Sequence, residues 1–340
     1  MATLAAVSSV AAQNMSFGAD NFYRSESVKL QPITFNTKYN NSIAGNLFLA
    51  NNLSTTTSQP AIVVGHPMGA TKEQSANLYA QKLAEQGFVT VTFDLPFFGL
   101  SDGLHNLVSP DMYTEAYSAA VDHLGTYDFV DRQRIGALGI CGSGGYVINA
   151  AKIDTRIKAI ATSSMYDMGA VSRDGLNNSQ NLETRIEILA NAAEARWAAV
   201  DGEPEAISIG TPLELTDETD AVSAEFYDFY RTYRGEYTAA GWMVNMTSHR
   251  TLATNIKFFN FYPFHNMEQI APRPLLIVSG DISHSREFSV DAYRAASEPK
   301  ELFWVPQASH TDLYDRTEII PFDKFTQFFR HNLAAGNSTN

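Results

Sequence analysis

The sequence predicts an α/β fold in which a mostly parallel sheet of eight strands carries helices on both faces. Apolar, β-branched segments alternate with helical segments along most of the chain, and this alternation is typical of a parallel sheet. One apolar segment also leads directly into a glycine-rich turn and a helix, over Gly139 to Gly145. Such a strand–turn–helix unit presents a single side chain at the tip of the turn.

The strands are expected where apolar runs are bounded by turn residues. The first two, Val28 to Phe35 and Ser42 to Leu49, predict an antiparallel hairpin around Asn40. An amphipathic helix is expected at 75–86, ended by the capping glycine Gly87. The remaining strands are expected, in chain order, at Ala61 to Gly65, Phe88 to Asp94, Ile135 to Ile140, Ile157 to Thr162, Pro274 to Ser279 and Glu301 to Pro306.

A long segment between the sixth and seventh strands contains no predicted strand and two predicted helices, Leu182 to Val200 and Ala221 to Tyr233. We therefore expect a helical cap here. The predicted organisation is an N-terminal arm at 1–27, a core at 28–164 and 271–333, a cap at 165–270 and a disordered tail at 334–340. The aromatic residues of the cap predict an apolar pocket with polar tyrosine tips, to which Tyr166, Tyr230 and Trp242 are expected to contribute.

The turn after Gly139 contains two candidate nucleophiles, Cys141 and Ser143. A strand, a sharp turn with one reactive side chain and a helix form the nucleophile elbow of an α/β-hydrolase, and small residues flank its strained tip. Because Gly139 closes the strand and the nucleophile follows two residues later, we favour Cys141 over Ser143. A buried structural cysteine is the alternative.

A cysteine nucleophile needs a base and an acid that orients the base, and in this fold they follow the nucleophile in the order acid, histidine. His310 fits the base, because it lies in the loop after the last strand. Asp281 fits the acid, because it directly follows the preceding strand, with Asp312 and Asp315 as alternatives.

Two backbone N–H groups are needed to hold the oxyanion. Gly142 follows the nucleophile and supplies one of them. Met68 is our choice for the other, because Pro67 has no N–H group. His66 either lines the pocket or braces its loop, and we interpret Asp94 as a structural acceptor for loop N–H groups.

The composition of the chain argues against several kinds of partner and site. The 340 residues carry a formal net charge of −13 with no basic patch, which argues against nucleic acid as a partner. The one cysteine excludes an internal disulfide and a cysteine-based metal site, and no segment is apolar enough to span a membrane. The first residues lack the basic region of a secretory signal, so a cytoplasmic location is favoured over secretion or a periplasm. A homodimer remains an open alternative.

Several segments together resemble one branch of the α/β-hydrolases, which contains dienelactone-hydrolase-like and peptidase-S15-like bacterial proteins and fungal polyketide transferases. They are Gly65 to Gln74, Tyr79 to Phe88, Gly139 to Tyr146, Ser164 to Gly169, Pro272 to Asp281, His284 to Ser289, Glu298 to Leu302 and Ala308 to Asp315. The resemblance supports a Cys141–Asp281–His310 triad. It implies that the protein hydrolyses or transfers acyl groups. We expect hydrolysis of a small-molecule ester, lactone or thioester through a thioester intermediate, with transfer of a polyketide-type acyl group to an alcohol as the first alternative and an inactive binding module for apolar ligands as the second. Neither a cofactor nor a metal is expected.

Overall fold

The computed structural model describes residues 18–208, 210–242 and 246–336. The predictions for 1–17 and 337–340 therefore lie outside the described residues. The described part of the N-terminal arm is held on the core, because the backbone N–H of Asp20 donates to the carbonyl oxygen of Asp315 at 2.9 Å. In the described residues no helix is both long and apolar enough to cross a bilayer.

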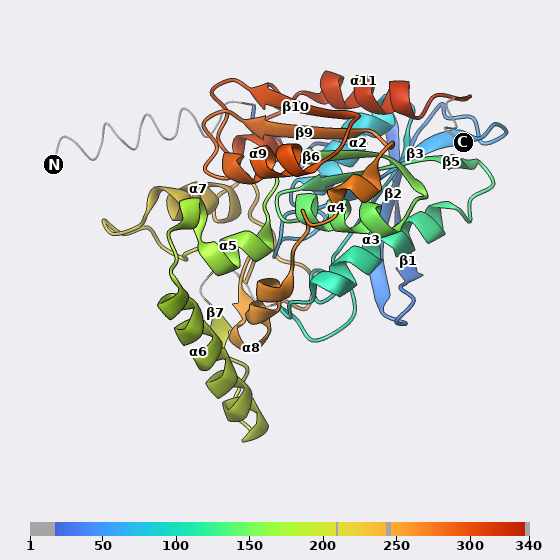
Figure 1. Ribbon diagram of the computed structural model, residues 1–340. Helices are drawn as coiled ribbons and strands as arrows, with labels where there is room; N and C mark the ends of the chain where they lie inside the picture. Colours follow the sequence, from blue (N-terminus) through green and yellow to red (C-terminus); the bar gives the residue numbers. More distant parts are fainter. Residues whose placement is uncertain (1–17, 209, 243–245, 337–340) are drawn as a thin grey trace, which may run out of the picture.

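The core is built on one eight-stranded sheet with the strand order β1-β2-β4-β3-β5-β6-β9-β10 (Figure 1). Strand β2 pairs antiparallel with β1 and β4, and every other pair in this sheet is parallel. The predicted mostly parallel sheet is thus confirmed. The strands are β1 Val28–Asn36, β2 Ser42–Ala50, β3 Gln59–Gly65, β4 Val89–Phe93, β5 Val130–Ile140, β6 Ile157–Ser163, β9 Leu275–Gly280 and β10 Lys300–Val305.

Helices cover both faces of the sheet because each crossover between parallel strands must bury its apolar face. Helices α2 and α11 contact each other, as do α3 and α4, and Figure 1 shows the two pairs on opposite sides of the sheet. The core helices are α2 Ala76–Glu85, α3 Pro110–Leu124, α4 Ser143–Ile153, α9 Arg286–Ala295, α10 Asp312–Asp315 and α11 Phe322–Asn332.

The segment between β6 and β9 forms the predicted helical cap and extends away from the core (Figure 1). It adds a feature the sequence did not predict, a two-stranded sheet of β7 and β8. Helix α6 protrudes, and its apolar residues Ile186 and Trp197 are more than half exposed. The cap elements are α5 Met168–Asp174, η1 Leu176–Asn178, α6 Leu182–Val200, β7 Ile207–Ser208, α7 Ala221–Tyr230, β8 Arg250–Thr251, α8 Leu252–Asn255, η2 Ile256–Asn260 and η3 Met267–Ile270.

Candidate active site

Cys141 lies at the tip of a tight turn between β5 and α4, with a positive φ of 55°. Its carbonyl oxygen accepts hydrogen bonds from the N–H groups of Gly144 and Tyr166, each at 2.9 Å. A non-glycine residue in the left-handed region is strained, and such residues concentrate at functional sites. Gly139 is required two residues earlier, because a Cβ there would lie 2.1 Å from the carbonyl oxygen of Ser143.

Ser143 occupies a different position. It is fully buried at the start of α4, and its hydroxyl donates to the carbonyl oxygen of His66 at 2.5 Å. This bond ties the elbow to the loop that follows β3. Of the two candidate nucleophiles, Cys141 is therefore the one at the tip of the turn, and Ser143 is bonded to backbone.

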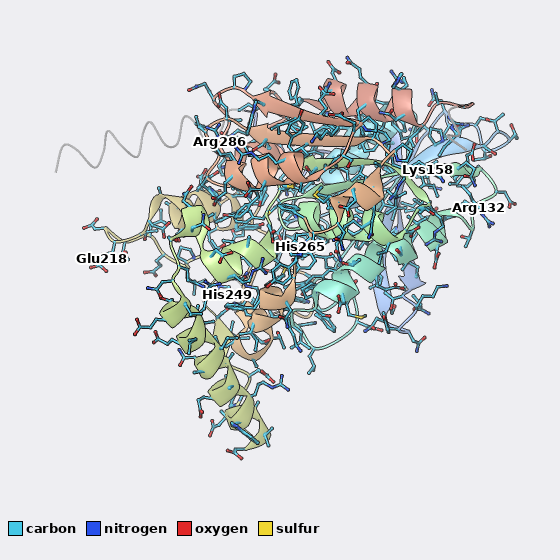
Figure 2. The ribbon with its side chains drawn as sticks, viewed as in Figure 1. Arg132, Lys158, Glu218, His249, His265 and Arg286 are labelled. Atoms are coloured by element: carbon cyan, nitrogen blue, oxygen red, sulfur yellow. The ribbon has the colours of Figure 1, made fainter. Side chains whose placement is uncertain are left out.

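Cys141 lines a cavity of about 380 Å³ between the core and the cap, a volume within the range of small-molecule sites. Its lining includes Met68 and Tyr314 from the core and Tyr166 and Tyr230 from the cap. Because Cys141 directly follows β5, the cavity lies where the carboxyl end of this strand meets the cap. In Figure 2 His249 marks the cap, whereas Arg132 and Lys158 mark the opposite end of the core.

The backbone N–H groups of Gly142 and Met68 both interact with the sulfur of Cys141. The two loops are in close contact, since a Cβ on Gly142 would lie 2.6 Å from the Cβ of Met68. Burial raises the pKa of the Cys141 thiol, and these N–H groups and the Tyr314 hydroxyl oppose that rise. Both N–H groups chosen from the sequence are therefore brought to the candidate nucleophile.

His310 is fully buried behind Tyr314. Its Nε2 lies 2.9 Å from the hydroxyl of Tyr314, and its Nδ1 lies 2.7 Å from the hydroxyl of Ser285. The Tyr314 hydroxyl also forms a hydrogen bond with Cys141, so it connects the sulfur with the imidazole. Burial and the neighbouring His284 hold the pKa of His310 well below its usual value, and at neutral pH the ring is an uncharged base.

Asp281 is not the partner of His310, and the predicted triad acid is wrong. Its carboxylate accepts from the N–H of Gln307 at 2.7 Å, which ties the end of β9 to the loop after β10. Ser285, at the end of the loop that follows β9, contacts Nδ1 of His310 instead.

The two alternative acids do not contact the imidazole either. Asp312 accepts from the N–H of Ser309 at 2.9 Å. Asp315 pairs with Arg234 of the cap at 2.6 Å.

The carboxylate that interacts with His310 belongs to Glu225, in α7 of the cap. One oxygen accepts from the N–H of Thr311 at 2.7 Å, and the other lies 2.9 Å from Nδ1 of His284. The rings of His284 and His310 are 4.7 Å apart between centroids. Burial opposes ionisation of Glu225, but the His284 hydrogen bond and the His310 interaction outweigh it and lower the pKa to about 2.

Of the four residues predicted to contact the substrate, two line the cavity, and the other two, His66 and Trp242, do not. Tyr166 and Tyr230 line the cavity with Cys141. His66 is fully buried, with Nδ1 2.8 Å from the carbonyl oxygen of Pro67 and Nε2 accepting from Leu95, so it braces its loop.

Trp242 also lies outside the cavity. It stacks on His105 and donates to the carbonyl oxygen of Gly99. Both His66 and Trp242 were therefore assigned wrongly to the substrate. Asp94 is structural as predicted: it accepts from the N–H groups of Lys72 and Leu100.

Sequence reasoning missed Tyr314, Ser285 and Glu225. Tyr314 follows His310 by four residues, in the short helix α10 directly after the loop that contains His310, and this closeness in sequence was an available signal. No comparable signal existed for Glu225, since its contact depends on how the cap lies on the core.

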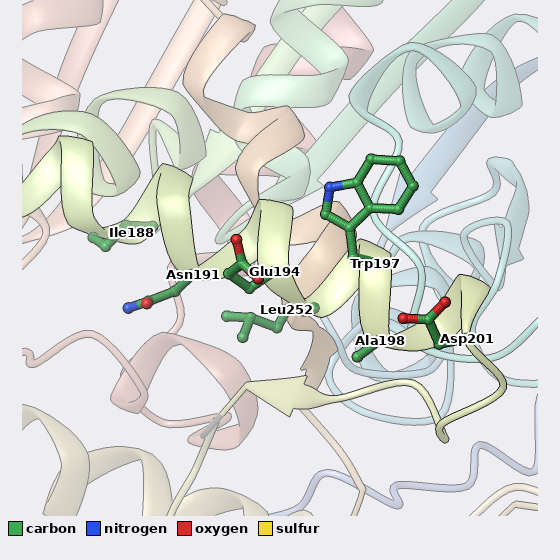
Figure 3. Close-up of a pocket in the computed structure, with 8 residues that line it drawn as sticks. Ile188, Asn191, Glu194, Trp197, Ala198, Asp201 and Leu252 are labelled. Carbon is green, nitrogen blue, oxygen red and sulfur yellow. The ribbon is translucent and has the colours of Figure 1, made fainter.

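A second hollow, of about 670 Å³, lies along the protruding α6 (Figure 3). Ile188, Trp197 and Leu252 contribute its apolar side chains, and Glu194 and Asp201 contribute carboxylates. It contains none of the predicted catalytic residues, so the candidate active site is the cavity at Cys141.

Comparison with known proteins agrees with this architecture. Residues 66–320 match the Alpha/beta hydrolase family, and the chain belongs to it. The chain is 43% identical to the uncharacterized protein PA2218 of Pseudomonas aeruginosa, over 92% of this chain and 83% of that one. It is 36% identical to the uncharacterized protein YcjY of Escherichia coli, over 75% of this chain and 82% of the relative. Acyltransferase drtE of Aspergillus calidoustus is 26% identical, over 75% and 80% of the two chains.

Comparison with solved structures also supports this fold. The crystal structure of PA2218 has a TM-score of 0.86 at 42% identity and covers 93% of this chain and 98% of its own. Est1E of Butyrivibrio proteoclasticus, solved with ferulic acid, has a TM-score of 0.59 at 18% identity, with 89% and 99% covered. At that identity the likeness shows the fold alone. The relatives thus include a protein named as an acyltransferase.

Proposed function

We propose that the protein is an acyl hydrolase that uses Cys141 as nucleophile and forms a thioester intermediate. One arrangement carries this proposal: Cys141 lies at a strained turn in the wall of a cavity, with the N–H groups of Gly142 and Met68 at its sulfur. A substrate carbonyl attacked there would place its oxygen near these donors, and such donors stabilise a tetrahedral oxyanion.

In the proposed reaction the Cys141 thiol gives its proton to Tyr314, whose own hydroxyl proton moves to Nε2 of His310. The Cys141 sulfur attacks the acyl carbon and a C–S bond forms. The oxyanion then collapses, the bond to the leaving group breaks, and the leaving group takes the proton from His310 by the same route. In the second half water attacks the thioester carbon and gives a proton to Nε2 of His310 through Tyr314. The C–S bond then breaks, the carboxylic acid leaves, and the sulfur takes the proton back from His310 by the same route.

The hydrogen bonds around His310 suit this direction of transfer. Nδ1–H can donate to Ser285, whose hydroxyl lies 3.0 Å from that of Ser283. This leaves Nε2 as the acceptor facing Tyr314. Glu225 replaces the sequence-predicted Asp281 as the carboxylate of the network, and it acts through His284 and Thr311 rather than through direct contact with His310.

Acyl transfer to an alcohol is the second candidate, and two observations favour it. The cap supplies Tyr166, Tyr230 and Phe226 to the cavity, and exclusion of water would let a thioester survive until an alcohol attacks. The relatives include acyltransferase drtE and polyketide transferase claH of Penicillium crustosum, at 26% and 22% identity. They also support placing the chain in the branch of the family that contains fungal polyketide transferases.

The test uses an activated acyl thioester followed by mass spectrometry of the intact protein. The wild type and Ser143→Ala should gain the acyl mass, whereas Cys141→Ala should not. Acylation that persists in Cys141→Ala, or is lost only in Ser143→Ala, would refute the assignment. Absence of any acylation would favour an inactive binding module.

A second measurement separates hydrolysis from transfer. The wild type is incubated with the thioester and a panel of alcohols, and free acid and new ester are quantified. Predominance of acid supports hydrolysis, and predominance of ester at millimolar alcohol supports transfer.

A further inference from the structure

The cavity at Cys141 contains a cation that the proposed mechanism does not use. Arg250 opens β8 and lines the same cavity as Cys141. Its backbone is held in the cap, since its carbonyl oxygen accepts from the Ser208 hydroxyl at 2.8 Å. Its Nε atom is buried and has no hydrogen-bond partner among the described residues. A buried N–H group of a guanidinium without a partner is costly, because burial removes its hydration.

The other buried cations of the fold show what is missing at Arg250. Lys72 is paired with Asp94 at 2.7 Å, and Arg234 is paired with Asp315 at 2.6 Å. No ion pair joins Arg250 to a carboxylate in the described part of the chain. The structure thus provides a fixed positive charge in the cavity without an anion of its own.

Among the described residues, the titratable groups that act on Arg250 include no carboxylic acid. Burial lowers the pKa of Arg250, and the titratable groups that oppose this effect are Tyr146, Tyr113 and Cys141, none of which is a carboxylate. An arginine keeps its proton even when such effects act on it. The charge is therefore present at neutral pH and is available to a ligand.

A second unsatisfied polar atom lies in the same cavity. Oδ1 of Asn255, in α8, is buried and has no hydrogen-bond partner in the described part of the chain, and Asn255 lines the cavity together with Arg250. The lining also includes apolar and aromatic groups, among them Val222 and Phe226. A purely hydrocarbon ligand would leave Arg250 unpaired, whereas a ligand with an anionic end could pair with it. Oδ1 of Asn255 is an acceptor and needs a donor on the ligand instead.

We propose that Arg250 binds a carboxylate at the far end of the substrate, so that the preferred substrates are acyl compounds bearing a second, ionised carboxyl group. Arginine suits this role because its planar fork pairs with a carboxylate through two parallel hydrogen bonds. The inference rests on the proposed function for the identity of the reacting carbonyl. The anion site itself needs only the cavity and Arg250.

The alternative role for Arg250 is activation of Cys141. Its charge does lower the pKa of that thiol, but less than the Tyr314 hydroxyl and the N–H groups of Gly142 and Met68 do. An activator would affect every substrate equally, whereas a carboxylate-binding residue affects only substrates that carry the anion. This difference is the basis of the test.

The kinetic arm compares 4-nitrophenyl hemiglutarate with 4-nitrophenyl valerate, two esters of similar length that differ in the terminal charge. In the wild type kcat/KM should be higher for the hemiglutarate. Arg250→Met should reduce that preference by about tenfold or more, as expected for loss of a charged hydrogen-bonded pair, and Arg250→Lys should restore part of it. Arg132→Met is the control, because Arg132 is exposed at the far end of the core and should leave the preference unchanged. Equal slowing of both esters by Arg250→Met would overturn the proposal.

The binding arm does not depend on turnover. Monomethyl glutarate and dimethyl glutarate are titrated into Cys141→Ala and into Cys141→Ala/Arg250→Met by calorimetry. Only the monoanion should bind, and only when Arg250 is present. Butyl phosphate distinguishes the anion type: tighter binding of the phosphate than of the carboxylate would overturn the assignment to a carboxylate.

If the monoanion binds through Arg250 and neither ester is hydrolysed, the anion site stands and the proposed reaction fails. If the esters are hydrolysed and no monoanion binds, the reaction stands and the anion site fails.

Discussion

The hydroxyl of Tyr314 lies 2.9 Å from Nε2 of His310 and also forms a hydrogen bond with the sulfur of Cys141. The side chain of Tyr314 therefore lies between the imidazole of His310 and the candidate nucleophile. A serine-type triad places the base directly on the nucleophile, so the arrangement around Cys141 differs in the proton path. Burial raises the pKa of the Tyr314 hydroxyl well above its usual value, so Tyr314 is protonated and can pass one proton on while it accepts another.

Removal of the Tyr314 hydroxyl should interrupt this path. We expect Tyr314→Phe to lower kcat by about 10²-fold, the usual size of a lost proton-transfer contribution, while the fold is kept. The control is Tyr127→Phe, because Tyr127 forms the same kind of bond to a histidine four residues earlier, His123, at 3.1 Å on the surface side of α3. Steady-state kinetics decides the question. Full activity in Tyr314→Phe would mean that His310 reaches Cys141 directly.

The acid side of the pH profile should report the low pKa of His310. The mechanism needs a neutral imidazole, and protonation of His310 as the pH falls stops it. Because burial and His284 lower the pKa of His310 below 6.5, activity should persist below pH 6.5 and be lost only at more acidic pH. His284→Asn removes one cause of the lowering, so the acid limb of kcat/KM should move up toward pH 6.5. An unchanged limb would show that His284 does not act on His310.

Glu225 should make folding stability depend on pH. Its folded-state pKa of about 2 lies below the ordinary 4.5, so its contribution is complete above pH 4.5 and is lost as the pH falls from 4.5 toward 2. The contribution is at most about 3 kcal/mol, and it is smaller where water screens the carboxylate, whose side chain is 20% exposed.

Urea unfolding at pH 7 and pH 3 measures this contribution. Glu225→Gln should destabilise the protein at pH 7 and much less at pH 3. Glu218→Gln is the control, because Glu218 is exposed at the tip of the loop before α7 (Figure 2), and it should be neutral at both pH values. An equal loss of stability at both pH values in Glu225→Gln would exclude an electrostatic origin.

The cap should govern substrate choice through the residues that reach the cavity. Tyr230 lines the cavity, whereas Trp242 is held on the segment 97–105. We therefore expect Tyr230→Ala to change the relative kcat/KM for short and long acyl chains several-fold. Trp242→Ala should leave that ratio unchanged, although it removes a packed aromatic ring and should lower the unfolding temperature. A common change for all chain lengths in Tyr230→Ala would mean that the cap only covers the site.

Local patterns in the chain were enough to predict the eight strands, the α6 helix and the position of Cys141. Leu182 to Val200 was expected as a helix, and α6 has these bounds. The glycines around Cys141 specify the turn because only a residue without a side chain fits at Gly139, where the backbone of Ser143 approaches. These features can be predicted from the sequence because each depends only on residues that are close together along the chain.

Contacts between distant segments decided the rest of the site. Asp281 follows the expected strand, and the loop after it turns so that Ser285 contacts His310. Glu225 reaches this network because α7 lies over the loop at Thr311. No periodicity encodes either contact, since both depend on how the cap packs on the core. The residue pattern alone was therefore enough to predict the sheet and the turn at Cys141, and it placed His310 in the loop after the last strand. Only the tertiary structure decided which groups orient that base and where Arg250 places its charge, because side chains from separate elements meet only after the chain has folded.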